Sequence, residues 1–173
     1  ALLLPTQPAS DFIQLYDAAQ QLAQGHNIMG ESAYFQHWPY QSGFVAWMAF
    51  WIRWLGAGVS FFQLTNALCA ALSNCLIYAL ARRFSSETGA RGAALLYLLY
   101  PGGYFLLSVL TNQHLSELLL LCALWVCTHP AEHTRARCLW GGAGGVLLAL
   151  SNAIRPMAIV VLLAAAAFGA MGL

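Results

Sequence analysis

The sequence predicts an all-α membrane protein with several transmembrane helices. Hydrophobic residues make up 60% of the 173-residue chain, charged residues make up only 8%, and the mean hydropathy is +0.65. A soluble domain needs about a quarter charged residues to cover its surface, so this composition excludes an ordinary soluble globule. The formal net charge of +1 gives no case for nucleic-acid binding, which needs a clustered basic surface.

Basic residues distinguish the two faces of the predicted membrane protein. The chain has no lysine, and five of its seven arginines lie in two short polar stretches, one in 82–91 and one in 129–137. Between them runs a nearly uncharged apolar block, residues 92–128. Short arginine-bearing loops that flank apolar spans are typical of the cytoplasmic face. We therefore expect both stretches on one side of the membrane, and Asp11 and Arg155 on the other.

The first third of the chain, residues 5–58, is predicted to be an outer loop whose helices lie in the membrane surface. Residues 10–24 have helical periodicity. They are too polar to span a membrane and too apolar on one face to leave it, as is typical of interfacial helices. Ser10 is the expected cap of this helix, and Gly25 is its expected end.

A second surface helix is expected at residues 44–55. Its 12 residues are fewer than the roughly 20 that a span needs, and they include three tryptophans and one arginine. Between the two helices, residues 26–43 are expected to form a loop whose aromatic and amide side chains suit the headgroup layer. Residues 56–58 should break the chain before the first span.

Residues 59–173 are predicted to form transmembrane helices, beginning with a full span at 59–81. The 37 residues of block 92–128 would run about 55 Å as a single helix, nearly twice the hydrocarbon thickness, and both ends are basic. A hairpin that turns at residues 111–114 satisfies both facts. Its short second arm leaves a re-entrant hairpin as an alternative. Pro101 predicts a break in the first arm.

The last part of the chain is expected to cross outward at residues 140–153, where the glycine-rich segment 141–145 allows close helix contact. A turn at Arg155 then sends the chain back. Residues 1–173 are thus interpreted as one transmembrane domain. Because the chain begins at Ala1 and ends inside an apolar run, we expect it to be the amino-terminal part of a longer transporter or enzyme, with the body of a first helix missing.

Two carboxylates are candidate catalytic residues. Asp11 is either a first-turn carboxylate that complements the helix dipole or a general base at the outer surface. Glu117 lies just inside an apolar helix, where a carboxylate is costly and usually functional, although it could also belong to a capping turn. His114 precedes Glu117 by one helical turn, so both can face one point. Two ligands do not define a metal site, so the sequence leaves undecided whether a divalent cation binds here.

The other candidates are binding residues. Arg155 is a candidate lipid phosphate-binding residue, because a guanidinium binds phosphate bidentately; the alternative is an arginine that snorkels at a helix end. A polar substrate pocket is predicted from the segment that carries Tyr34, His37, Tyr40 and Gln41. The same side chains could equally form an ordinary aromatic belt.

Several short motifs lie along the chain: SDF at 10–12, YFQHWPYQSG at 34–43, YPGGYF at 100–105, TNQHLSELLLL at 111–121 and SNAIRPMAIV at 151–160. Together they resemble the GT-C superfamily of polytopic membrane glycosyltransferases. The resemblance is to the family 39-like branch, which includes protein O-mannosyltransferases and aminoarabinose transferases. Such enzymes carry an acid in the first outer loop and a second acid at a later short helix, and Asp11 and Glu117 match these positions. The first loop holds a single Asp11 rather than a paired acid, which leaves metal dependence open.

The resemblance implies a multi-pass transferase of the cell membrane with its active site on the extracytoplasmic face. It implies a polyprenyl-phosphate-linked sugar as donor and a lipid, protein or glycan as acceptor. Asp11 would then deprotonate the acceptor, and Arg155 would stabilise the lipid phosphate. The alternatives are a membrane transporter or flippase that uses Glu117 and His114 as a proton relay, and a non-catalytic membrane scaffold.

Overall fold

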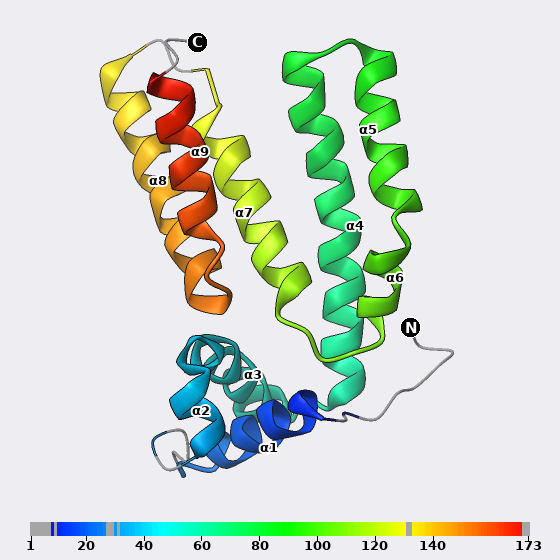
Figure 1. Cartoon of the computed structure of the whole chain (residues 1–173), viewed down its shortest axis with the longest axis vertical. Helices are drawn as coiled ribbons and strands as arrows, with labels where there is room; N and C mark the ends of the chain where they lie inside the picture. Colours follow the sequence, from blue (N-terminus) through cyan, green and yellow to red (C-terminus); the bar gives the residue numbers. More distant parts are fainter. Residues whose placement is uncertain (1–7, 9, 27–29, 31, 131–132, 171–173) are drawn as a thin grey trace.

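The computed structural model describes residues 8, 10–26, 30, 32–130 and 133–170. Every regular element within these residues is helical, which confirms the all-α prediction. Helices α4 to α9 stand upright side by side, and α1 to α3 lie across one end of them (Figure 1). The expected remnant of a preceding helix, at residues 1–5, lies outside the described part of the chain.

The helices of the described residues follow in chain order. They are α1 (Asp11–Ala23), α2 (Ala33–His37), the short 3₁₀ helix η1 (Pro39–Gln41), α3 (Ser42–Leu55), α4 (Val59–Phe84), α5 (Glu87–Leu99), α6 (Pro101–Leu107), α7 (Gln113–Cys127), α8 (Thr134–Ile154) and α9 (Ala158–Ala170).

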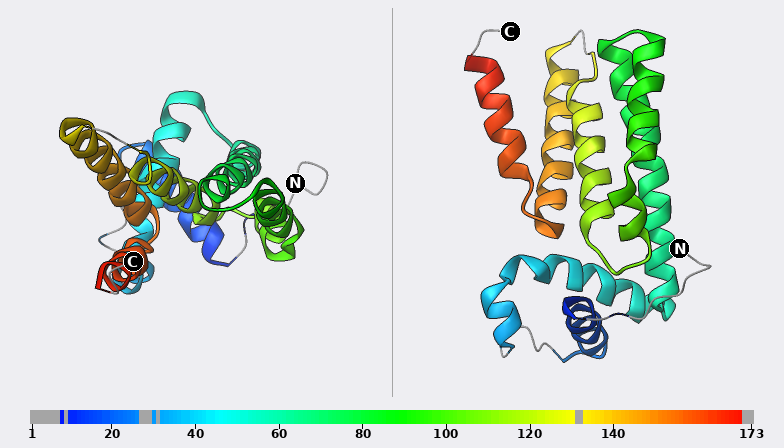
Figure 2. Two further views of the ribbon diagram at one scale, coloured as in Figure 1. Left: turned by 90° about the horizontal axis from the view of Figure 1, so that it is seen from above. Right: turned by 45° about the vertical axis from the view of Figure 1, so that its right-hand side comes forward.

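The surface layer, which we define as α1, α2, η1 and α3, is held together by the packing of α1 on α3. Burial of a large apolar side chain contributes about 1.5–3 kcal/mol. The buried side chains of the two helices are Leu15, Ala18, Ala19, Phe44, Val45, Met48 and Ala49. Figure 2 shows the layer running across the end of the upright bundle, which is the orientation expected of helices in a membrane surface.

Two glycines end the surface helices at the predicted places. α1 stops just before Gly25, which has a φ of 95°, and α3 stops at Gly56, which has a φ of 60°. Both angles lie in the left-handed region that glycine adopts without a steric penalty. The expected break before α4 (Val59–Phe84) is therefore confirmed.

Two other expectations about the layer are wrong. Ser10 makes no side-chain capping hydrogen bond to α1. Residues 26–43 are not one loop, because α2 and η1 lie within them and α3 already starts at Ser42. Pro39 explains the extra turn, since its fixed φ suits the first position of a helix. The hydroxyl of Ser42 then donates to the Pro39 carbonyl over 2.7 Å.

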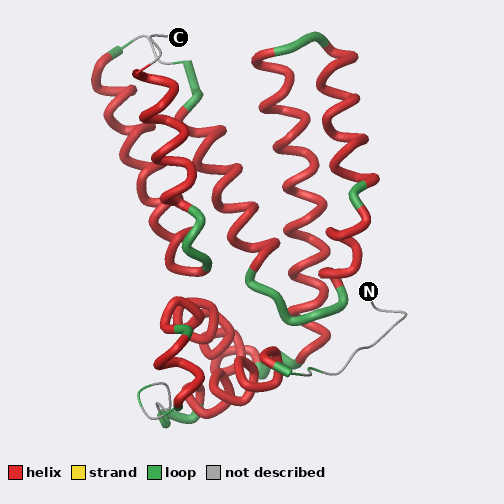
Figure 3. Tube along the Cα trace, in the orientation of Figure 1, coloured by secondary structure: helices red, strands yellow, loops and turns green. Residues whose placement is uncertain are grey.

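The upright bundle contains one helix, among those described, that is long and apolar enough to cross a membrane by length and composition, namely α4. α7 is a shorter apolar helix. The chain over residues 92–128 runs out and back as predicted, with α5 and α6 on one arm and α7 on the other. The arms do not form a closely packed pair, because both pack on α4, which lies between them (Figure 1). The first arm breaks where Pro101 begins α6, as predicted. The loop that joins the arms lies next to the surface layer (Figure 3).

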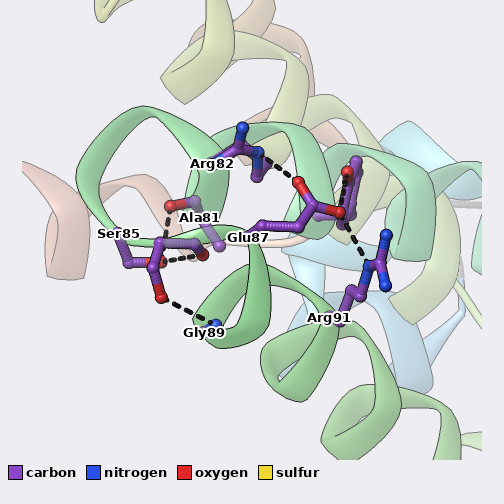
Figure 4. Close-up of polar contacts among 8 residues, drawn as sticks. Ala81, Arg82, Ser85, Glu87, Gly89 and Arg91 are labelled. Atoms are coloured by element: carbon purple, nitrogen blue, oxygen red, sulfur yellow. Dashed lines mark hydrogen bonds and ion pairs between the residues drawn. The ribbon is translucent and has the colours of Figure 1, made fainter.

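The predicted arginine-bearing loop 82–91 is much shorter than expected, because α4 continues to Phe84 and α5 begins at Glu87. Serine and carboxylate side chains make this tight turn stable. The Ser86 hydroxyl accepts from the Gly89 amide over 3.3 Å, and such a cap satisfies a free helix donor. Figure 4 shows the carboxylate of Glu87 at the centre of the turn.

Glu87 receives three contacts there. It accepts hydrogen bonds from the Tyr78 hydroxyl over 2.9 Å and from Arg91 Nε over 2.7 Å. Its second oxygen pairs with Arg82 Nε over 2.7 Å. Three of the chain's arginines thus gather at one end of the bundle, since Arg83 also lies in the last turn of α4.

Arg83 fixes α7 to α4 at this end. Its Nη1 donates to the Trp125 carbonyl over 2.6 Å and to the Thr128 hydroxyl over 2.7 Å. The guanidinium also lies 4.6 Å from the centre of the Trp125 ring. The second arginine-bearing stretch lies at the same end of the bundle, where α8 begins (Figure 1). The expectation that Arg135 and Arg137 belong to a loop is wrong, because α8 starts at Thr134.

α8 is longer than the predicted 140–153, and it packs closely on α7. The expected close contact at the glycine-rich segment is confirmed at Gly144. A Cβ there would lie 2.2 Å from Cys127 Sγ. Nearer the surface layer, Ser116 and Ser151 bond to each other: their hydroxyls are 3.0 Å apart, and Ser151 Oγ donates to the Ser116 carbonyl over 2.8 Å.

The surface layer meets the bundle where the first turn of α3 contacts the end of α8. At Gly43 a Cβ would lie 1.8 Å from the Ala153 carbonyl oxygen. That oxygen belongs to the backbone of a packed helix, so it cannot move aside as a flexible side chain can. Only glycine allows this approach.

We expect Gly43→Ala to lower the free energy of unfolding by about 1–3 kcal/mol, the usual cost of overpacking. Thermal unfolding of the purified protein in detergent measures this. Gly141→Ala is the matched control, because no atom lies within 4 Å of its Cβ position and alanine favours a helix over glycine. Equal stability of the two variants would contradict the close contact at Gly43.

The turn between α4 and α5 should stabilise the protein in a pH-dependent way. The Tyr78 hydroxyl, and then the Arg91 guanidinium, hold the pKa of Glu87 below its usual value. Because the folded pKa is depressed, the stabilisation is present above the pKa of an unfolded glutamate, about 4.3, and is lost as the pH falls through the lower folded pKa. Glu87→Gln should therefore lower the melting temperature at neutral pH and flatten its fall in acid. Asp17→Asn, which removes an exposed carboxylate of α1, is the control. An acid profile of Glu87→Gln that does not differ from that of the control would contradict the prediction.

Candidate functional site

The candidate site is a polar network centred on Asn112, in the loop before α7. The Asn112 Nδ2 group donates to Gln41 Oε1 over 3.0 Å and to the Ile154 carbonyl over 3.1 Å. Its Oδ1 accepts from Arg155 Nη1 over 3.2 Å. Asn112 is only 6% exposed, so these bonds form away from bulk water. One side chain therefore joins the surface layer, the loop before α7 and the turn after α8.

The network continues from Gln41 toward Asp11. The Gln41 side chain lies near the hydroxyl of Tyr34 and acts on its ionisation. Burial, followed by the negative charge of Asp11 and the neighbouring Tyr40, raises the pKa of Tyr34, and the Gln41 side chain acts in the opposite direction. Asp11 is itself exposed in the first turn of α1. The structure thus brings four of the sequence-predicted residues into one series. Arg155 and Gln41 are joined through hydrogen bonds to Asn112, and Tyr34 and Asp11 extend the series through electrostatic interactions.

Two other predicted binding residues occupy the edge of the layer. His37 is exposed, and its Nδ1 lies 2.8 Å from the carbonyl of Ala33 in its own helix. The structure does not bring it to the network. Tyr40 is also exposed and packs edge-on against Trp38, with ring centres 6.1 Å apart. Tyr40 stays within electrostatic range of Tyr34, so it borders the network.

A cavity of about 700 Å³ lies on the other side of Arg155, between α4, α5, α6 and the first turns of α7. Most of its lining is apolar. The polar residues that line it are Asn74, Tyr97, Tyr100, Tyr104, Gln113, His114, Ser116, Glu117 and Arg155. Asp11 is not among the lining residues. Arg155 also donates to Gln113 Oε1 over 3.4 Å, so its guanidinium stands between the network and the cavity.

Glu117 and His114 face each other in this cavity, as their spacing predicts. His114 Nδ1 lies 3.9 Å from Glu117 Oε2, and the hydroxyl of Tyr97 lies beside the same carboxylate. α7 begins at Gln113 with Asn112 at its N-cap position, and its first turn holds no acidic residue, so Glu117 does not complement the start of the helix as the capping alternative requires. The two predicted acids, Asp11 and Glu117, therefore lie in different environments.

The described residues contain no group of three histidine, cysteine, aspartate or glutamate side chains that could hold a metal ion. A divalent cation at this site would need further ligands beyond Glu117 and His114. The arrangement supports hydrogen bonding, proton acceptance and phosphate binding by this chain's own side chains.

Sequence reasoning missed Asn112, Gln113, Asn74 and Tyr97 as parts of the site. Asn112 was expected only in a turn or as a cap. The sequence pattern around Asn112 is weak evidence, because an amide side chain directly before an apolar helix more often caps that helix than forms several buried hydrogen bonds. The partners of Asn112 are distant in the sequence, and only the fold brings them to it.

We expect Asn112→Ala to lower the free energy of unfolding by at least about 2 kcal/mol, because each buried group left without its hydrogen bond costs about 1–3 kcal/mol. Three partners are affected, one each on Gln41, Ile154 and Arg155. Chemical denaturation in detergent measures the change. Gln20→Ala, at an exposed position of α1, is the control. A loss no larger than that of the control would show that Asn112 does not hold the layers together.

Three comparisons with known proteins leave the family open: no protein-family model, no curated protein and no solved structure matches this chain significantly. Its function has to be argued from the geometry of the site.

Proposed function

We propose that this chain forms the donor and acceptor site of a membrane glycosyltransferase that uses a polyprenyl-phosphate-linked sugar. The observation that carries the proposal is the series from Asp11 to Arg155. It holds a candidate phosphate-binding cation, Arg155, in a hydrogen-bonded network with Asn112 and Gln41 beside an apolar cavity. The candidate base, Asp11, lies within electrostatic range of Tyr34 at the other end of the series.

The outer surface of the bundle supports a membrane location. Large apolar side chains on several upright helices are exposed, including Leu96 at 74%, Phe105 at 74% and Leu139 at 75%. Extensive exposed apolar surface is rare on soluble monomers and common where lipid or a partner covers it. In the proposed multi-pass topology, the arginine-rich end faces the cytoplasm, and the surface layer lies at the extracytoplasmic face of the cell membrane.

The cavity and Arg155 suit the donor. Isoprene units are apolar and would lie against the alanine and leucine side chains of α4 and α6 that line the cavity. The phosphate would meet the guanidinium of Arg155 at the cavity rim, where a planar cation can bind two of its oxygens. Gln113 and Asn112 hold that guanidinium in place.

Asp11 suits the acceptor. Its carboxylate is exposed beside the network, where a hydroxyl of a lipid, protein or glycan acceptor can reach it. Asp11 would accept the hydroxyl proton as the oxygen attacks the anomeric carbon. The bond between that carbon and the phosphate oxygen would break, and its electron pair would leave with the lipid phosphate, whose charge Arg155 stabilises. Tyr34, Tyr40 and Gln41 would contact the sugar or the acceptor.

Asp11→Asn in the intact protein should lower the rate of sugar transfer by about 10²–10⁴-fold while leaving folding and donor binding largely unchanged. The amide keeps the shape of the carboxylate and much of its capping capacity, but it cannot accept the proton. Loss of a helix cap alone would cost only about 1 kcal/mol of stability. Release of sugar from a radiolabelled polyprenyl-phosphate donor, with and without a chelator, measures the rate and shows whether a metal is needed.

Asp17→Asn is the matched control, because Asp17 lies exposed on the same helix and has no part in the proposed site. If Asp11→Asn retains more than about a tenth of the wild-type rate, Asp11 is a cap or a substrate contact. Absence of transfer, together with a proton-driven solute flux that Glu117→Gln abolishes, would favour the alternative of a transporter with a Glu117 and His114 relay.

A further inference from the structure

The cavity contains polar atoms that the network does not use. Among the described residues, five buried side-chain nitrogen or oxygen atoms lack a hydrogen-bond partner, and three of them belong to residues that line the cavity: Asn74 Oδ1, His114 Nδ1 and His114 Nε2. His114 is only 2% exposed. Buried polar groups without a partner are rare in native structures and call for an explanation, such as a bound ligand.

The unsatisfied groups are mainly acceptors. Asn74 Oδ1 can only accept, and so can an ionised Glu117 carboxylate. The backbone of Gly103 lies near the His114 ring and can accept its N–H, which leaves the other nitrogen of a neutral ring as a further acceptor. Asn74, His114 and Glu117 come from α4 and α7, two helices that pack on each other and both line the cavity. A group with several N–H donors and a positive charge matches this set, and a primary ammonium has three such donors.

At Arg155 the cavity carries a positive charge and donor groups instead of acceptors. Arg155 carries a positive charge there, and its Nη1 lies 3.4 Å from Gln113 Oε1. Gln113 and Glu117 are four residues apart on α7, so they are separated by about 6 Å along the helix axis. A ligand that places an anion at Arg155 and an ammonium at Glu117 must therefore hold the two charges about one helical turn apart.

We propose that this cavity binds the phosphoethanolamine headgroup of an aminophospholipid. Its phosphate would meet Arg155, and its ammonium, two carbons away, would donate to Glu117, Asn74 and His114. The alanine and leucine side chains that line the cavity would contact the acyl chains. This inference goes beyond sugar transfer and does not depend on it. Both lipids would use Arg155 for their phosphate, so they would compete for the cavity.

The test compares two lipids that share the phosphate and differ in the amine. The intact protein is placed in phosphatidylglycerol nanodiscs that contain small, equal amounts of phosphatidylethanolamine and phosphatidylcholine with matched acyl chains. Native mass spectrometry measures which lipid stays bound. We expect phosphatidylethanolamine to be retained about tenfold or more over phosphatidylcholine, whose quaternary ammonium has no N–H group, because hydrogen bonds to charged groups are the stronger ones. Equal retention by the wild-type protein would overturn the proposal.

Glu117→Gln removes the charge that would face the ammonium and should abolish the preference. Glu87→Gln makes the same change in the turn at the far end of the bundle and should keep it. A preference that survives in Glu117→Gln would contradict the assignment. Excess soluble phosphoethanolamine should displace the retained lipid, and failure to do so would show that the acyl chains are bound rather than the headgroup. None of these measurements needs turnover, so an inactive transferase would leave the test valid.

Discussion

The structure depends on the buried amide of Asn112, which links three parts of the chain that lie far apart in the sequence. Its three hydrogen bonds reach the surface layer at Gln41, the end of α8 at Ile154 and the turn at Arg155. A buried amide must satisfy both its donor and its acceptor atoms, so its position fixes all three partners together. The close approach of Gly43 to Ala153 adds a steric constraint beside it.

The same constraint organises the chemistry of the site. Arg155 is held on one side by Asn112 and on another by Gln113, and it stands between the network that leads to Asp11 and the cavity that contains Glu117. A long arginine side chain loses much of its conformational freedom when it is ordered. Asn112 and Gln113 hold the Arg155 side chain in one conformation before a ligand binds. Binding of an anion therefore costs less conformational entropy.

Part of the site could be predicted from the sequence, because some of its signals are local. The facing pair of His114 and Glu117 follows from helical spacing alone, and a carboxylate within an apolar helix is costly enough to attract attention. The grouping of Asp11 and Glu117 as two acids of one site does not follow from spacing, and the structure places only Glu117 in the cavity. Asn74 and Tyr97 were overlooked, since a single polar residue inside an apolar span has no local pattern.

The sequence by itself determined the helical class and most of the points where helices break. Pro101 and Gly56 act through the sterics of their own backbone, so their effects are present before any tertiary contact forms. The tertiary structure alone decided which polar groups meet. Gln41 and Asn112 are 71 residues apart, and Asn112 and Arg155 are 43 residues apart. Hydrogen bonds over such separations form only after packing has closed the chain between them, because the entropy of the intervening segment opposes them until then.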